Sequence, residues 1–145
     1  MKKPNMNNRS LVIMLCMVAF FTMGSVLSVS AAPTPVPVTI AAVFDFSTFP
    51  DVTGTFTTTG ALTISGPATM HVGLINPSGL VAHCVVTLIA PNGTIIIHQE
   101  CQFDTSPPKG RWQIASGTGA YANLRGNGSL LMPPLTEAMR GFIYE

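Results

Sequence analysis

The sequence predicts an all-β fold, an antiparallel barrel of about eight strands, with a β-sandwich as the alternative. Apolar and polar residues alternate with a spacing of two over most of the chain beyond residue 36, which is the pattern of half-buried strands. No long segment repeats its apolar residues at the period of a helix. The segment Ser116–Ser129 carries four glycines around a short apolar stretch, which is typical of a tight turn followed by a bent strand at a barrel corner.

Each predicted strand follows from this alternation. In the first, residues 36 to 46, Phe44 and Phe46 continue an apolar series while Thr39 and Asp45 fall between its members. In the second predicted strand, residues 54–65, threonines alternate with apolar residues and form a solvent-facing side. The predicted strands cover residues 36–46, 54–65, 70–74, 80–90, 94–103, 111–115, 126–132 and 138–144. A turn of helix is expected at most at residues 120–124.

The first 31 residues have the layout of a secretory signal peptide. A basic start is followed by the apolar run Leu11–Phe21 and by the small or modest residues Val29-Ser30-Ala31. The alternative is an uncleaved membrane anchor, for which the apolar run is short. Cleavage after Ala31 leaves a Pro-rich lead-in, residues 32–37, and a single β-barrel domain, residues 38–145. The expected location is therefore outside the cytoplasm, periplasmic or extracellular, with no integral membrane segment after cleavage.

The charge of the remaining chain excludes some partners. Without residues 1–31 it has four basic and six acidic residues, a formal charge of −2. Nothing in this balance attracts nucleic acid or an anionic membrane surface. The sequence does not indicate the oligomeric state.

The two cysteines outside the leader lie in one predicted hairpin. If Asn92-Gly93 is a two-residue loop, Cys84 lies directly opposite Cys101, within reach of a disulfide bond. A four-residue loop keeps this register and places Pro91 in the loop, where its missing N–H group is not needed for a hydrogen bond between the strands. A three-residue loop would instead place the cysteines on opposite faces. Because an even number of cysteines in an exported chain favours pairing, we expect a Cys84–Cys101 disulfide.

No motif for a metal, a cofactor or a catalytic nucleophile is present in the sequence. His71, His83 and His98 fall on the polar faces of their strands, scattered over the expected outer surface, whereas a metal site needs three or four converging ligands. We therefore expect solvated histidines, no metal site and no cofactor.

Residues 117–126 read GTGAYANLRG and resemble the GTG-x-[YF]-x-x-x-R-G signature of secreted β-barrels related to allene oxide cyclases and plant dirigent proteins. The resemblance covers about a dozen residues. It implies a calycin-like barrel whose apolar cavity holds a few polar groups that steer or protonate a substrate. No catalytic residue is carried over, because the acidic and polar residues of those active sites have no counterparts that align here.

The candidate ligand-binding residues follow from the alternation and from the glycine-rich motif. Alternation turns Asp45 and Arg111 outward. The residues expected to line the interior are Phe44, Phe46, Phe56 and Trp112, joined by Tyr121 and Arg125 of the motif. For Arg125, a surface or barrel-end ion pair is the favoured role, and ligand binding is the other.

Three functions are compatible with these observations. The leading one is a non-enzymatic exported barrel that binds a small apolar ligand. An isomerase, cyclase or dirigent-like enzyme acting on a lipid or phenolic substrate rests on the family resemblance alone. The third is a structural or surface-associated protein.

Overall fold

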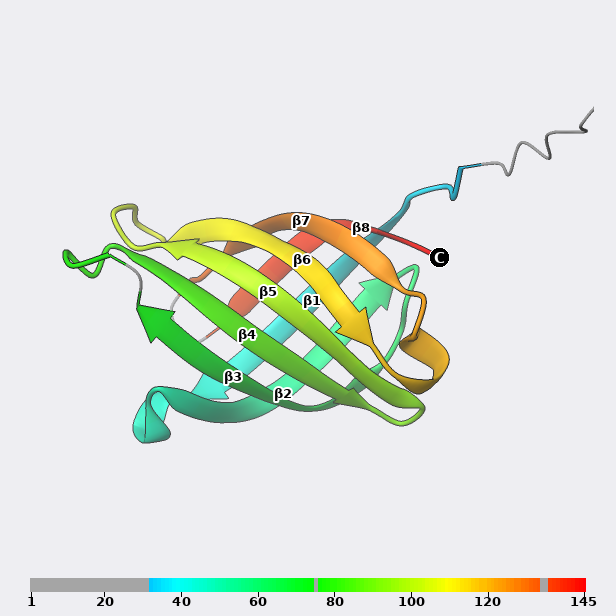
Figure 1. The fold of residues 1–145 in the computed structure, drawn as a ribbon, viewed down its shortest axis with the longest axis horizontal. Coiled ribbons are helices and arrows are strands. Elements are labelled where there is room, and N and C mark those ends of the chain that lie inside the picture. Colours follow the sequence, from blue (N-terminus) through cyan, green and yellow to red (C-terminus); the bar gives the residue numbers. More distant parts are fainter. Residues whose placement is uncertain (1–31, 75, 134–135) are drawn as a thin grey trace, which may run out of the picture. The chain divides into compact units, whose positions relative to one another are not determined.

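The computed structural model describes residues 32–74, 76–133 and 136–145, and within them a body of eight strands (Figure 1). The strands are β1 (Val36–Asp45), β2 (Asp51–Gly60), β3 (Ser65–Leu74), β4 (Val81–Ala90), β5 (Gly93–Gln102), β6 (Lys109–Gly117), β7 (Arg125–Leu131) and β8 (Glu137–Tyr144). Two 3₁₀ turns accompany them, η1 (Phe46–Thr48) and η2 (Gly119–Tyr121). The described residues contain no helix long and apolar enough to cross a membrane.

The strands form one closed barrel in chain order. Every strand pairs antiparallel with the next, and β8 closes the sheet by pairing with β1. The prediction of an antiparallel eight-stranded barrel is confirmed, and the sandwich alternative is wrong. The predicted helical turn corresponds to η2, which begins one residue earlier.

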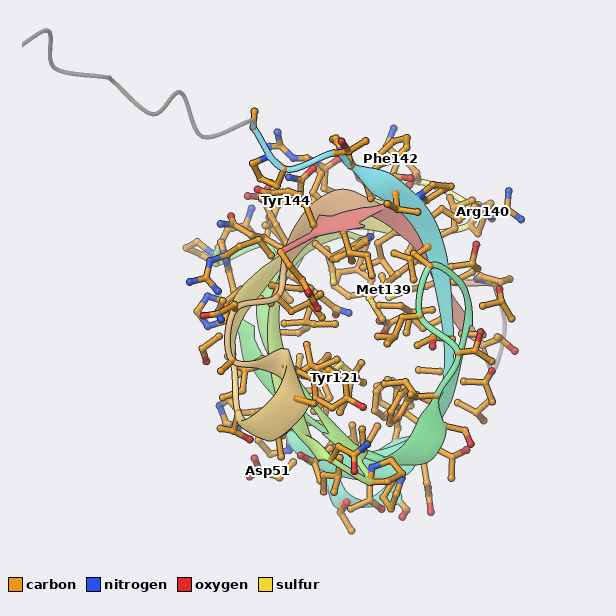
Figure 2. The ribbon with its side chains drawn as sticks, turned by 90° about the vertical axis from the view of Figure 1, so that its right-hand side faces the viewer. Asp51, Tyr121, Met139, Arg140, Phe142 and Tyr144 are labelled. Carbon is orange, nitrogen blue, oxygen red and sulfur yellow. The ribbon has the colours of Figure 1, made fainter. Side chains whose placement is uncertain are left out.

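Alternation places one face of each strand inside the barrel. Along β8, Met139 points into the interior while Arg140 and Phe142 point outward (Figure 2). Buried residues of all eight strands, with Tyr121 and Leu124 from the β6–β7 connection, form one core cluster, in which valine, isoleucine and leucine outnumber four aromatic residues. This burial is the main stabilising contribution to such a fold.

Glycines make room for the large aromatic side chains of the core. The cross-strand partner of Phe44 is Gly54, and the partner of Phe56 is Gly66. A Cβ added at either glycine would lie within 3.3 Å of the facing ring. Glycine opposite an aromatic residue therefore lets the ring lie over the neighbouring strand.

The glycine-rich segment joins β6 to β7 and packs on the β4–β5 turn. Gly119 has a positive φ of 58°, and a Cβ at this position would overlap the carbonyl oxygen of Asn92. The next amide, that of Ala120, donates to the same oxygen at 2.9 Å. The glycine thus permits a close contact between two connections.

The register of the β4–β5 hairpin differs from the prediction. Ala90 pairs with Gly93, so the two loop residues are Pro91 and Asn92 rather than Asn92 and Gly93. Pro91 provides the fixed φ that suits a turn, and it lies outside the ladder, where its missing N–H is not needed. Gly93 is held against the carbonyl of Thr118, which leaves no room for a Cβ. Neither of the registers weighed from the sequence is correct.

The shifted register changes the relation between the two cysteines. Cys84 pairs with Gln99, and Cys101 pairs with Ala82, so the cysteines are diagonal neighbours on the inner face. Both are buried free thiols with their sulfur atoms 3.9 Å apart. The expected directly opposed pair is therefore wrong, and no disulfide bond is formed. Diagonal neighbours have Cα atoms roughly 7–8 Å apart, which disfavours bonding without backbone movement.

Candidate ligand site

A hollow lies at the end of the barrel where β1 begins and β8 ends, and we call it the mouth pocket. Its volume is about 320 Å³. The lining residues are Thr34, Val36, Ala61, Leu62, Ala120, Tyr121, Leu124, Ile143, Tyr144 and Glu145. Most of these side chains are apolar or aromatic, and this size falls at the lower end of pockets that hold small molecules.

Tyr121 reaches the mouth pocket from η2. Its amide donates to the carbonyl of Thr118 at 3.0 Å, and its carbonyl accepts from the amide of Leu124 at 3.1 Å, so the turn fixes the backbone on both sides. Its ring points toward the barrel interior (Figure 2) and is buried. The glycine-rich motif therefore places an aromatic side chain over one end of the barrel.

The candidate residues predicted from the sequence do not form one site. Tyr121 lines the mouth pocket, whereas Phe44, Phe56 and Trp112 are buried in the core and are not among its lining residues. Arg125 is exposed, and its Nη1 donates to the carbonyl oxygen of Leu124 at 3.0 Å. Of the six candidates, only Tyr121 contacts this pocket.

The prediction that Phe46 lines the interior is wrong. Strand β1 ends at Asp45, whose Oδ1 accepts a hydrogen bond from the amide of Ser47 and caps the turn η1. Phe46 belongs to this turn and is 55% exposed. The spacing of two continues in the sequence for one residue beyond the end of the strand, and a capping aspartate marks the break. Asp45 and Arg111 are exposed, as predicted.

A polar cluster missed by the sequence analysis crosses the barrel. The amide nitrogen of Gln99, on β5, donates to the Glu137 carboxyl on β8, and the same nitrogen lies 3.3 Å from the sulfur of Met139. The Gln99 oxygen lies 4.0 Å from the sulfur of Cys101, which in turn contacts Cys84. Strands β5 and β8 are not neighbours in the sheet, so this chain of contacts spans the interior. We call these five residues the cross-barrel relay.

One signal for the relay was present in the sequence. Gln99 lies in phase with Ile95, Ile97 and Cys101, so the alternation that places those residues inside also places Gln99 inside. Glu137 lies one residue before the strand predicted from residue 138, and it is in phase with Met139.

Burial controls the ionisation of the relay. Loss of hydration raises the pKa of the Glu137 carboxyl to about 7, and the hydrogen bond from Gln99 offsets only part of this effect. The hydrogen bond with the Cys84 thiol and burial both raise the pKa of Cys101. A carboxylic acid at Glu137 and a neutral thiol at Cys101 are therefore the forms that suit this interior at mildly acidic pH.

The histidines lie on the outer surface, as predicted. His71 contacts Asp51 through Nδ1 and Oδ1 at 2.6 Å, and both side chains are mostly exposed. Within residues 32–74, 76–133 and 136–145, no three His, Cys, Asp or Glu side chains are grouped so that they could hold a metal ion. The outer surface also has grooves of about 490 and 480 Å³, bordered by charged and amide side chains such as Glu100, Arg111 and Gln113.

Neither a protein-family model nor a curated protein matches this sequence.

Proposed function

We propose that this chain is an exported small β-barrel protein that binds a small apolar ligand at the mouth pocket. The observation that carries the proposal is the combination of a lining made mostly of apolar and aromatic residues, a volume of about 320 Å³ and the ring of Tyr121 at one end of a closed barrel. Barrel mouths are frequent sites for small ligands. The proposed export depends on the leader, residues 1–31, which lies outside the described residues.

The core limits how deep such a ligand can go. The most fully buried side chains of the interior include Phe56, Trp112 and Leu88. The side chains of the cross-barrel relay occupy further space inside the barrel. A ligand at the mouth would therefore bury its apolar part against Leu62, Leu124 and Ile143 rather than pass through the barrel. This arrangement favours a compact ligand over a long acyl chain.

We further propose that the chain is related to the allene oxide cyclase-like and dirigent-like barrels that its motif resembles. The closed eight-stranded architecture is compatible with that relationship. The motif glycines act in the turn and strand geometry, and Tyr121 adds a pocket wall. A shared fold does not assign an enzymatic activity to this chain.

One observation favours an enzymatic alternative. Glu137 is a buried carboxyl group whose pKa is raised to about 7, which suits general acid–base chemistry near neutral pH. However, Glu137 begins β8 while Tyr144 at the mouth ends it, so the acid lies at the opposite end of that strand. An isomerase or cyclase would therefore need a substrate that reaches past the mouth pocket.

The proposal is tested with the neutral apolar dye N-phenylnaphthylamine, whose fluorescence rises in an apolar site. Ala61 is an exposed residue of the pocket lining, so Ala61→Trp fills the pocket while sparing the core. Ala115→Trp is the matched control, because Ala115 is exposed and lies outside the lining. We expect saturable binding that Ala61→Trp weakens about tenfold or more and Ala115→Trp leaves unchanged. No saturable binding would favour the structural or surface-associated alternative, and equal binding by both variants would show that the dye binds away from the mouth pocket.

A further inference from the structure

The interior of the barrel contains one carboxyl group. Among the described residues, the buried polar side chains are those of Thr58, Gln99 and Glu137. The Thr58 hydroxyl is engaged in the β2–β3 connection, where it donates to the carbonyl of Leu62 and accepts from the amide of Ile64. Glu137, 5% exposed, has no such local partner and depends on Gln99 from across the barrel.

Among the described residues Glu137 forms no salt bridge, and only burial and the Gln99 hydrogen bond shift its pKa. Strand β5 presents Gln99 and the Cys101 thiol, and β4 presents the Cys84 thiol. On β1, the cross-strand partner of Glu137 is Ala42. Of these groups only the two thiols can titrate, and their ionisation would add negative charge. The charged form of Glu137 therefore has a single amide donor in place of its hydration shell, which is a costly state.

We propose that the cross-barrel relay is a pH-sensitive brace, which holds β8 against β5 while Glu137 is protonated and lets the end of the barrel where β8 begins open when Glu137 ionises. Opening brings the carboxylate to water, where its charge is stabilised. It also separates Gln99 from Glu137 and exposes the thiols of Cys84 and Cys101. The brace operates without a ligand and is independent of the mouth pocket.

The direction of the effect follows from proton linkage. In the closed barrel the pKa of Glu137 is about 7, whereas in the open, hydrated state it returns toward the ordinary value of 4.5. Between these two values the open state holds fewer protons than the closed state, so rising pH favours opening. The opening equilibrium should increase by up to about tenfold for each pH unit within this window and level off above it.

The buried thiols report this opening directly. We would measure the rate at which dithiodipyridine labels the full chain carrying Cys16→Ser, so that Cys84 and Cys101 are the only thiols. Each rate is divided by the rate for the same protein in denaturant at the same pH, which removes the intrinsic pH dependence of the thiols. Glu137→Gln keeps a neutral group of the same shape, and Glu100→Gln is the matched control, because Glu100 borders the outer grooves on the same strand as Gln99.

We expect the normalised labelling rate to rise by more than about tenfold between pH 5 and 7 in the parent and in Glu100→Gln, and to stay flat in Glu137→Gln. A flat profile in the parent, or an equal rise in Glu137→Gln, would overturn the proposal.

A measurement on the unaltered chain covers the case in which Glu137→Gln does not fold. The sequence has three glutamates, Glu100, Glu137 and Glu145, so carbon-13 labelling of their carboxyl groups gives three resolvable titrations. The proposal requires one midpoint near 7, accompanied by chemical-shift changes at the amides of Gln99 and Cys101. Three midpoints at ordinary values, or a midpoint near 7 without changes at β5, would reject it.

Discussion

Trp112 on β6 is hydrogen-bonded to Arg140 on β8 across an intervening strand. The indole Nε1 donates to the Arg140 carbonyl oxygen at 3.4 Å, although β6 and β8 each pair with β7 and not with each other. Gly128 of β7 lies opposite Trp112, and Gly141 of β8 lies opposite Gly128. Two facing glycines thus form a smooth surface on which the largest side chain of the core lies flat.

This relationship explains Gly128 of the glycine-rich motif, whereas a Cβ at Gly126 would meet Phe142 and Ile143 of β8. Neither Gly126 nor Gly128 has a positive φ, so backbone freedom does not account for them. A Cβ at Gly128 would overlap the carbonyl of Arg140, and a Cβ at Gly141 would lie 2.8 Å from the Trp112 ring. The glycines are architectural because they leave space for the indole and for close strand contact.

Gly128→Val should destabilise the barrel by on the order of 3 kcal/mol, because the added side chain would overlap the β8 backbone at Arg140 and Gly141. Ser129→Val is the control, since the neighbouring residue is exposed and valine suits a strand. Urea denaturation followed by tryptophan fluorescence measures both. Equal stability of the two variants would contradict the packing role of Gly128.

The fold was predictable because the alternation is nearly continuous. The inward series that ends with Phe44 is visible in the sequence. The number of strands and the short connections are compatible with either a barrel or a sandwich, and the glycine-rich corner and the family resemblance favoured the barrel. The ends of the strands were less predictable. Asp45 caps a turn in place of continuing β1, and a sequence pattern does not distinguish these two roles of an aspartate.

The site was less predictable, because it depends on contacts between strands that do not pair. Gln99 and Glu137 are 38 residues apart and meet across the interior, which alternation along one strand cannot reveal. The hairpin register failed for a different reason. The dipeptide Asn92-Gly93 predicts a turn with these two residues in the loop. In the structure Gly93 instead lies in β5, against the carbonyl of Thr118, and this tertiary contact is not visible in the local sequence.

Phe46→Ser should leave the free energy of unfolding within about 0.5 kcal/mol of the parent value, because the ring is already more than half exposed. Phe56→Ala should cost roughly 3–5 kcal/mol, because it leaves a cavity in the core. Chemical denaturation of the two variants side by side makes the comparison. A large loss of stability in Phe46→Ser would indicate that the Phe46 ring packs inside the barrel.

The two thiols should both be free and protected in the folded protein. In the chain carrying Cys16→Ser, purified without reductant, unfolding should release two reactive thiols, from Cys84 and Cys101. Before unfolding, labelling should be slow because both side chains are buried. An intact mass lower by two hydrogens, with no thiol released by denaturant, would show that the diagonal pair does bond.

Global stability should fall as the pH rises from about 4.5 to about 7, if other groups contribute equally in the folded and unfolded states. The pKa of Glu137 is higher in the folded protein than in the unfolded chain, so within this window the unfolded chain binds fewer protons and deprotonation favours unfolding. The loss should be on the order of 3 kcal/mol, complete near pH 7 and constant above it. Glu137→Gln should remove this dependence of stability on pH, whereas Glu100→Gln, which changes a carboxyl at the outer surface, should retain it.

Urea denaturation midpoints at pH 4.5, 5.5, 6.5 and 7.5 give the four points that define the curve of stability against pH. A parent protein whose stability rises through this range, with Glu137→Gln following the same curve, would show that the interior carboxyl is ionised in the folded barrel.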